Sequence, residues 1–371
     1  MSLYRKLVRP LLFRLPAETA HHATLTACRV GGRVPGLPGL MGRLFETSAP
    51  NLETELAGIR LKSPIGLAAG WDKSGQALRM IDRLGFGFAE IGSISARPSR
   101  GNPRPRLFRL PEDQAIVVNY GLPNDGAETV SRRLRSADLT IPLGINLVKT
   151  NDGPDAAPCD EAQILWDYHA SVSAFHRQAD YLTLNLSCPN AAGGKDHFAQ
   201  PGSIRRLLCR LAEESPACPM FLKVAPDPDP ANLIRLLEES DPFPFVRGFI
   251  FNLPAGKPPT LSLRTPRSRW SHLPGAVSGR PVSALIDDCI ARLYRLAAPG
   301  RYQIIGVGGI FSAEDAWNKI RLGASAVQIY TALVYEGPGV IPRIHRGLAE
   351  RLEREGFRSI AQAVGTATRR A

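Results

Sequence analysis

The sequence predicts an α/β fold, a (β/α)8 TIM barrel with a small N-terminal helical extension. From residue 60 onward, eight short apolar runs alternate with amphipathic stretches, and polar or glycine residues recur where the runs end. Such runs are typical of strands buried on both faces, and eight strand–helix units close into a barrel. A doubly wound sheet is the structural alternative, but no Gly-x-Gly-x-x-Gly motif follows an early run.

The predicted elements follow one another regularly. The predicted strands are residues 64–69, 88–94, 141–147, 181–186, 220–224, 248–252, 303–307 and 326–330. The predicted helices are residues 74–84, 161–178, 203–214, 232–239, 284–296, 313–322 and 340–355. Leu233, Leu236 and Leu237 show the i, i+3, i+4 spacing of a helix with one buried face. Because functional residues of a barrel gather at the carboxyl ends of its strands, we expect the polar strand ends to form one site.

The N-terminal segment differs from the rest of the chain. Leu3, Leu7 and Leu11 lie four residues apart among basic residues, and Pro16 opens a second short helical segment. A basic, amphipathic helical hairpin suits an interfacial membrane anchor. It equally suits a helical pair that caps the base of the barrel, and the pattern leaves both open. We expect residues 1–40 to form this extension and residues 41–371 to form the barrel.

Composition narrows the function classes. The chain has 371 residues, 44% of them apolar, and a formal net charge of +12. No apolar run approaches the roughly 18–20 residues that span a bilayer, and no secretory signal is visible. The charge suits an anionic lipid or substrate, whereas nucleic acid is not expected because no aromatic-rich basic motif is present. The six cysteines form no Cys-x-x-Cys pair, so we expect reduced thiols and no metal site.

Residues 185–190, Asn-Leu-Ser-Cys-Pro-Asn, form the most informative motif, because they follow an apolar strand. Asn185 and Asn190 offer amide donors and acceptors, which suit a planar ligand with carbonyl and N–H edges. Cys188 offers a thiol that titrates closer to neutrality than a hydroxyl, so it is a candidate proton acceptor. A strand-end turn with a buried cysteine is the alternative. The two flanking amides favour a site.

Two further features suit a flavin. Residues 305–309, Ile-Gly-Val-Gly-Gly, end the seventh strand, and residues 328–331 end the eighth. Glycines let backbone N–H groups approach a phosphate, and this is the usual phosphate position in barrels. Lys73 follows the first strand, and Lys223 lies in an apolar strand. A lysine in the barrel mouth needs an anionic partner, such as the N1–C2=O edge of a reduced flavin. Together these features predict flavin mononucleotide (FMN) with a substrate stacked against it.

At these motifs the chain resembles dihydroorotate dehydrogenase, and specifically its membrane-associated, quinone-reducing class 2, with some features of the soluble class 1. The resemblance runs from about residue 16 to residue 369. The motifs that carry it are residues 68–73, 90–93, 101–110, 143–146, 185–190, 278–280, 305–309 and 328–331. It implies FMN-dependent oxidation of (S)-dihydroorotate to orotate, with a quinone as electron acceptor, in de novo pyrimidine (UMP) biosynthesis. It also implies a peripheral protein on the cytoplasmic face of the inner membrane.

The resemblance further implies roles for individual residues. The flavin would be held by Ala69, Gly70, Lys73, Ser93, Asn146, Asn185, Lys223, Gly279, Gly308, Gly309, Tyr330 and Thr331. The substrate would be held by Lys73, Asn119, Asn185, Asn190 and Asn252. The quinone tunnel would be lined by His21, Arg109 and Tyr330. Cys188 would be the base that removes a proton from C5 of dihydroorotate while hydride passes from C6 to flavin N5.

The chain departs from the family pattern in its base. Cys188 stands where the quinone-reducing class has serine, and cysteine is typical of the soluble class. A thiol is more acidic than a hydroxyl, so we expect a lower pH optimum.

Two substrate positions also depart from the family pattern. In ungapped register Val118 stands at a substrate-binding asparagine, unless Asn119 is shifted into that role. Around Asn252, Leu253 breaks a Thr-Asn-Thr pattern. Losing two amide contacts costs ~1–3 kcal/mol each. A second hypothesis is therefore a paralogue that acts on another cyclic amide or an enoyl compound. A third is a membrane-docked barrel that binds flavin or phosphate without turnover.

Overall fold

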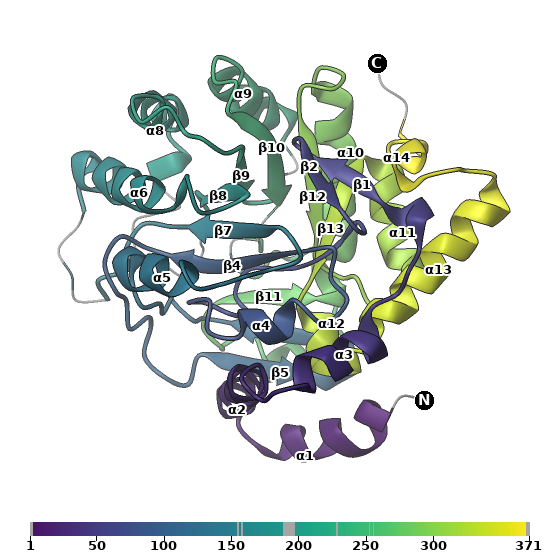
Figure 1. Ribbon diagram of the computed structural model, residues 1–371. Coiled ribbons are helices and arrows are strands. Elements are labelled where there is room, and N and C mark those ends of the chain that lie inside the picture. The colour runs from purple at the N-terminus through teal and green to yellow at the C-terminus, as the bar shows by residue number, and fades with distance from the viewer. Residues whose placement is uncertain are drawn as a thin grey trace.

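The structure, a computed structural model, describes residues 3–153, 156, 159–187, 197–227, 229–251, 253–254 and 256–368. Within these residues, eight parallel strands close into a barrel in the order β10-β12-β13-β3-β4-β7-β8-β9 (Figure 1). The barrel strands are β3 (Ile65–Leu67), β4 (Phe88–Ile94), β7 (Leu143–Leu147), β8 (Tyr181–Asn185), β9 (Met220–Val224), β10 (Val246–Phe251), β12 (Gln303–Val307) and β13 (Ala324–Ile329). The predicted fold class and all eight predicted strands are confirmed.

Large and small side chains alternate inside the barrel. Phe88 on β4 lies over Gly66, where an added Cβ would come within 2.4 Å of the ring. Tyr181 lies over Gly144 in the same way, with 2.0 Å to such a Cβ. Glycine at these two positions therefore makes room for rings that fill the barrel interior, and the barrel is a packed core.

Helices cover the outside of the barrel. They are α4 (Leu78–Ile81), α5 (Ala127–Leu134), α6 (Glu161–Phe175), α8 (Ser203–Ala212), α9 (Pro230–Ser240), α10 (Ser283–Leu296), α11 (Ala313–Leu322), α12 (Thr331–Glu336), α13 (Val340–Glu355) and α14 (Ile360–Ala363). The short helical turns are η2 (Pro50–Leu52), η3 (Pro111–Asp113), η4 (Arg267–Arg269) and η5 (Arg280–Val282). On α9, Leu233, Leu236 and Leu237 are buried, as their spacing predicts.

One predicted helix is much shorter than expected. The structure has only the single turn α4 within residues 74–84. The Asp72 carboxylate accepts hydrogen bonds from the backbone N–H groups of Ser74, Gln76 and Ala77. This side chain therefore organises the backbone before α4 as a loop, because acidic side chains compete with helix formation for nearby N–H groups.

A hairpin that the sequence analysis did not predict closes the base of the barrel. It consists of β1 (Thr54–Leu56) and β2 (Ile59–Leu61), and its turn donates a hydrogen bond from Ala57 to Gln303 at the start of β12. Leu56 and Leu61 are fully buried against the side chains of Phe88, Tyr181, Phe221, Ile250, Ile305 and Ala326. The base is therefore sealed by apolar burial.

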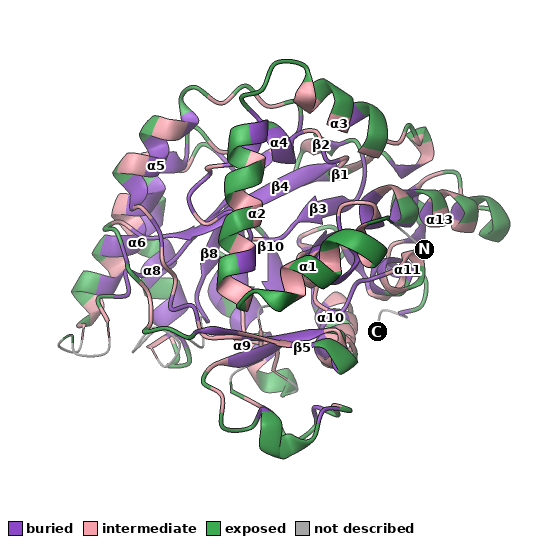
Figure 2. Cartoon of the chain, turned by 90° about the horizontal axis from the view of Figure 1, so that it is seen from below, coloured by how far each residue is buried: buried purple, intermediate pink, exposed green. Residues whose placement is uncertain are grey.

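The N-terminal helices start at the opposite end, and the last of them, α3, ends beside Gly85, shortly before β4 begins. They are η1 (Tyr4–Val8), α1 (Arg9–Arg14), α2 (Ala17–Gly31) and α3 (Leu37–Phe45). Figure 1 and Figure 2 show α1 and α2 beside β5 (Leu107–Leu110), which pairs with β6 (Ala115–Val118) and β11 (Ala276–Gly279) in a three-stranded antiparallel sheet. The alternative that these helices cap the barrel base is wrong, because the β1–β2 hairpin occupies that place. Among the described helices, none has the length and apolar character needed to cross a bilayer.

Candidate active site

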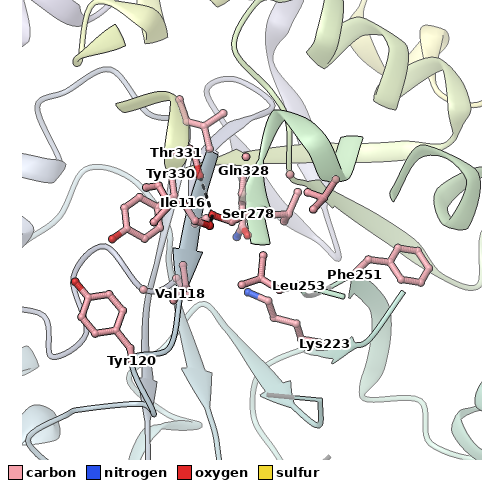
Figure 3. Close-up of a pocket in the computed structure, with 18 of the residues that line it drawn as sticks. Ile116, Val118, Tyr120, Lys223, Phe251, Leu253, Ser278, Gln328, Tyr330 and Thr331 are labelled. Atoms are coloured by element: carbon pink, nitrogen blue, oxygen red, sulfur yellow. Dashed lines mark hydrogen bonds between the residues drawn. The ribbon is translucent and has the colours of Figure 1, made fainter. Parts of the chain in front are cut away.

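A cavity lies between the carboxyl ends of the barrel strands and the three-stranded sheet (Figure 3). The space between its walls is about 1230 Å³, its opening to solvent included. Eleven of the twelve residues predicted to hold a flavin line it. They are Ala69, Gly70, Lys73, Ser93, Asn185, Lys223, Gly279, Gly308, Gly309, Tyr330 and Thr331. Residues far apart in the sequence therefore meet at one place, where a ligand can contact several strand ends at once.

The twelfth residue, Asn146, lies one layer behind the cavity wall. Its side chain is fully buried, and its Oδ1 accepts a hydrogen bond from the Ser93 hydroxyl. The Ser93 oxygen in turn accepts a hydrogen bond of 3.1 Å from Nδ2 of Asn185. Asn146 therefore orients two cavity-lining side chains by a chain of hydrogen bonds.

Glu90 was given no individual role by the sequence analysis, although it lies at the centre of this layer. Its carboxylate is fully buried, and Oε1 accepts a hydrogen bond of 2.8 Å from Nδ2 of Asn146. Nζ of Lys223 lies 3.9 Å from the same oxygen. The anionic partner expected for Lys223 is therefore present within the protein. A carboxylate in the otherwise apolar run of residues 88–94 was the available signal.

Lys73 lies at the edge of the cavity that faces α2. Nζ donates a hydrogen bond of 2.8 Å to the Gly70 carbonyl and lies 3.4 Å from Nε2 of His21. It also lies 3.8 Å from the centre of the Tyr120 ring. The pKa of Lys73 is lowered to about 7, mainly by loss of solvent around the ammonium; Asp72 opposes this effect and Arg106 adds to it. At neutral pH the group is therefore divided between its charged and neutral forms, and an anionic ligand favours the charged form.

The end of the cavity at β12 and β13 is built from glycine backbone. Gly308 and Gly309 have φ angles of +93° and +75°. A Cβ on Gly309 would lie 2.5 Å from the Cβ of Ser283, so a larger residue does not fit there. Ser312 accepts a hydrogen bond of 3.2 Å from the backbone N–H of Asp315 and caps α11. Exposed backbone next to a capped helix start suits a phosphate group.

The wall near β13 carries an acceptor that no described residue satisfies. Nε2 of Gln328 donates a hydrogen bond of 2.9 Å to Oε2 of Glu90, which fixes the orientation of the amide. Oε1 of Gln328 is buried and accepts no hydrogen bond from the described part of the chain. At the end of the neighbouring strand β3, Ala68, Ala69 and Gly70 permit close approach of a flat group. An N–H edge on a flat ring suits this acceptor, so these residues fit a flavin ring with its phosphate at the glycine end.

The predicted tunnel residue His21 brings α2 to the cavity edge. Its ring centre lies 6.2 Å from that of Trp71, 6.1 Å from that of Tyr120 and 6.2 Å from that of Tyr330. Burial and the nearby Lys73 ammonium lower the pKa of His21 well below its ordinary value. A neutral imidazole therefore lies between α2 and the cavity.

Arg109, a second predicted tunnel residue, holds the turn between α1 and α2. It donates a hydrogen bond of 3.0 Å to the Leu12 carbonyl and another to the Leu15 carbonyl. Its guanidinium carbon lies 4.4 Å from the centre of the Phe13 ring. Because Arg109 lies on β5, it attaches the helical pair α1 and α2 to the three-stranded sheet that forms one wall of the cavity.

Comparisons with known proteins agree with this geometry. The sequence pattern of the family described as dihydroorotate dehydrogenase matches residues 51–352. A protein named dihydroorotate dehydrogenase (quinone) from Cereibacter sphaeroides is 40% identical over 370 residues, which cover 99% of this chain and 98% of the relative. A protein of the same name from Sphingopyxis alaskensis is 38% identical over 365 residues, covering 97% and 96% of the two chains.

The fold comparison agrees as well. A crystal structure of DHODH from Eimeria tenella in complex with ferulenol matches with a TM-score of 0.79 and 29% identity, covering 94% of this chain and 95% of that one. The chain belongs to the dihydroorotate dehydrogenase family. Enzymes of this family are flavin-dependent, which agrees with the fit of a flavin ring to the cavity.

The wall expected to face dihydroorotate carries apolar side chains at the two positions where the sequence departs from the family pattern. Val118 and Leu253 line the cavity (Figure 3). Asn119 is not among the described lining residues, and its Oδ1 accepts a hydrogen bond of 3.0 Å from Nδ2 of Asn102. The structure therefore does not bring Asn119 to the cavity wall, and Val118 occupies that position on β6.

Three of the predicted catalytic and substrate-binding residues lie outside the described part of the chain. They are Cys188, Asn190 and Asn252. Their roles as base and as substrate ligands stay predictions from the sequence.

Proposed function

We propose that this protein oxidises (S)-dihydroorotate to orotate with a quinone as electron acceptor, a step of de novo pyrimidine biosynthesis. One observation carries the proposal. Eleven predicted flavin-binding residues, from Ala69 to Thr331, line a single cavity at the barrel mouth. Relatives named dihydroorotate dehydrogenase (quinone) support it, because they match nearly the whole chain.

The flavin that we assign is FMN, with its phosphate at Gly308 and Gly309 and its ring beside Lys223 and Gln328. Bound flavin supplies the hydride acceptor for C6 of the substrate and passes the electrons on to the quinone. Lys73 neutralises the carboxylate of the substrate, and we assign to Asn185 a hydrogen bond to the substrate ring.

We assign proton removal to Cys188. In this assignment its thiolate takes the proton from C5 of dihydroorotate. The chain retains Cys188 as a base, and Lys73 and Lys223 at the mouth of the barrel. These residues favour an enzyme over a barrel that binds flavin without turnover.

Quinone access and membrane binding are assigned to the N-terminal extension, residues 1–40, and catalysis to the barrel, residues 41–371. Leu3, Leu7 and Leu11 are 72%, 58% and 62% exposed, and Arg5, Lys6, Arg9 and Arg14 lie among them. Exposed leucines with flanking cations suit the surface of an anionic bilayer. In this proposal the protein lies peripherally on the cytoplasmic face of the inner membrane, and the quinone passes His21, Arg109 and Tyr330.

Binding to lipid vesicles tests the membrane assignment. We expect the double variant Leu7→Asp/Leu11→Asp to lose co-sedimentation with vesicles that contain phosphatidylglycerol. Ile234→Asp is the matched control, because Ile234 is 43% exposed on α9, far from the extension in sequence. Equal loss in both variants, or no loss in either, contradicts the assignment.

An anaerobic flavin experiment tests the proposed reaction. We expect the purified protein to be yellow, to bleach when dihydroorotate is added, and to recolour when a ubiquinone analogue follows. A colourless protein that takes up no FMN rejects flavin chemistry altogether. A yellow protein that millimolar dihydroorotate does not bleach rejects the substrate.

The apolar lining at Val118 and Leu253 favours one second candidate. A paralogue with the same flavin would oxidise a different cyclic amide, or reduce an enoyl compound, because these side chains cannot satisfy the polar edges of orotate. Anaerobic flavin reduction across a panel of cyclic amides, with reoxidation by enoyl compounds, separates the candidates. Rapid reduction by dihydroorotate at ordinary concentrations excludes the paralogue.

A further inference from the structure

Glu90 contacts both the Lys223 ammonium and the amides of Asn146 and Gln328. It lies on β4 and is fully buried, yet it does not itself line the cavity. Its four hydrogen-bond donors are Asn146 Nδ2 at 2.8 Å, Gln328 Nε2 at 2.9 Å, Thr183 Oγ1 at 3.1 Å and Tyr181 OH at 3.2 Å. The Lys223 ammonium at 3.9 Å adds a charge partner. These contacts come from four other barrel strands, β7, β8, β9 and β13.

The contacts of Glu90 are those of an ionised carboxylate. An ionised carboxylate is an acceptor only, with about four lone-pair positions. Four neutral donors and one cation surround it, which satisfies both its hydrogen-bonding capacity and its charge. Glu90 and Lys223 therefore form a buried pair of opposite charges, with Lys223 in the cavity wall and Glu90 directly below it.

The carboxylate also sets the direction of the neighbouring hydrogen bonds. Because Glu90 only accepts, Asn146 must turn its Nδ2 towards it and its Oδ1 towards the Ser93 hydroxyl. The Ser93 oxygen is then available to accept from Nδ2 of Asn185. On the other side, Gln328 must turn its Nε2 to Glu90, which directs Oε1 away from the carboxylate. One charge thus orients three amides around the site.

We propose that Glu90 is a positioning residue that tunes the reduction potential of the bound flavin, by offsetting the charge of Lys223 and by orienting the amides of Asn146 and Gln328. The inference rests on the proposed function in one respect, that the cavity holds a flavin. Lys223 lies in the cavity wall, where its positive charge favours the anionic reduced flavin and raises the potential. The negative charge of Glu90 opposes this effect. Glu90 therefore sets how far reduction is favoured, without touching the ring.

The decisive measurement is the midpoint potential of the flavin in the purified holoenzyme. We expect Glu90→Gln to raise the potential, because the ammonium of Lys223 is then uncompensated. The expected change is at least tenfold in the equilibrium constant for reduction, which is about 30 mV for a two-electron couple. Lys223→Met should lower the potential, and the double variant Glu90→Gln/Lys223→Met should lie between the single variants.

Tyr181→Phe is the matched control. It removes one hydrogen bond to Glu90 while leaving the carboxylate charge and the ring that packs in the barrel base. A purely structural role for Glu90 predicts the same potential in Glu90→Gln as in Tyr181→Phe, and that result overturns the inference.

Two further outcomes are informative. If Glu90→Gln does not retain flavin, the double variant should retain it, because removing both members of a buried ion pair costs less than removing one. A double variant that is as defective as the single variant also overturns the inference. Wild-type protein that takes up no flavin contradicts the proposed function instead, so the two failures are distinguishable.

Discussion

The base and the mouth of the barrel are formed by the same strands but are held together by different interactions. At the base, Leu56 and Leu61 of the hairpin are fully buried against an entirely hydrophobic cluster. At the mouth, Ser93, Asn185 and Lys223 are held by hydrogen bonds and charge that lead back to one buried carboxylate. Burial of apolar side chains stabilises the base whether or not a ligand is bound. The oriented polar groups at the mouth instead form a cavity that suits a ligand.

Tyr181 marks the boundary between the two regions. Its ring packs with Phe88 and Phe221 in the base, with ring centres 6.3 Å and 5.5 Å away. Its hydroxyl donates to Glu90. Tyr181 therefore contacts both the apolar cluster that stabilises the fold and the polar network of the candidate site. Substitutions in the cluster should change the free energy of unfolding, whereas substitutions in the site should change the reaction.

The largest effect is expected at the mouth, from Cys188→Ala. Loss of a general base costs about 10²–10⁴-fold in the rate of flavin reduction by substrate. Stopped-flow measurement of anaerobic bleaching checks this. Cys188→Ser should recover much of the rate, since serine is the base in the quinone-reducing class that the chain resembles. An unchanged rate in Cys188→Ala means that the cysteine is not the base.

At the base, a substitution should lower the free energy of unfolding and leave the reaction unchanged. Leu56→Ala removes a fully buried side chain and should lower the free energy of unfolding by about 2–5 kcal/mol. Leu44→Ala is the control, because Leu44 is 59% exposed and its loss should cost no more than about 0.5 kcal/mol. Denaturant unfolding measures both. If flavin reduction per folded molecule falls with Leu56→Ala, the base and the mouth are not separable.

A smaller effect, in the direction of gain, is expected from Val118→Asn. The new amide can satisfy a polar edge of orotate and should tighten its binding by about 1–3 kcal/mol. Ile116→Asn is the matched control, two residues away on β6 and also in the cavity wall. Titration of orotate against the flavin absorbance measures both. Equal gain in the two variants, or none in Val118→Asn, excludes position 118 as the missing substrate contact.

The smallest effect concerns the pH dependence of product binding. The ammonium of Lys73, with its pKa lowered to about 7, loses its proton as the pH rises through that value. The anionic carboxylate of orotate binds the protonated form, so its affinity should be constant below pH 7 and fall by about tenfold per pH unit above it. Lys73→Arg should remove the dependence, because arginine stays charged. A pH-independent affinity in the wild type contradicts the assigned contact.

Local patterns were sufficient to predict the barrel strands, because each strand is predominantly apolar and is bounded by polar or glycine residues. Individual residues of the cavity wall were also predictable, since Lys73, Asn185 and Gly308 lie at or shortly after strand ends. The helix over residues 74–84 failed because one side chain, that of Asp72, captured the backbone N–H groups that a helix start would use.

Contacts between residues far apart in the sequence could not be predicted from local sequence patterns. The hairpin over the base and the extension at the mouth are both amphipathic, and only the closed barrel decides which end each one covers. The Glu90 network joins residues up to 238 positions apart. The sequence by itself determined the barrel strands, all but one of the predicted helices and the candidate site residues, because those depend on neighbouring residues. The tertiary structure decided which side chains pair below the cavity and which residue of the pair Val118 and Asn119 faces it, because barrel closure and strand register set those contacts.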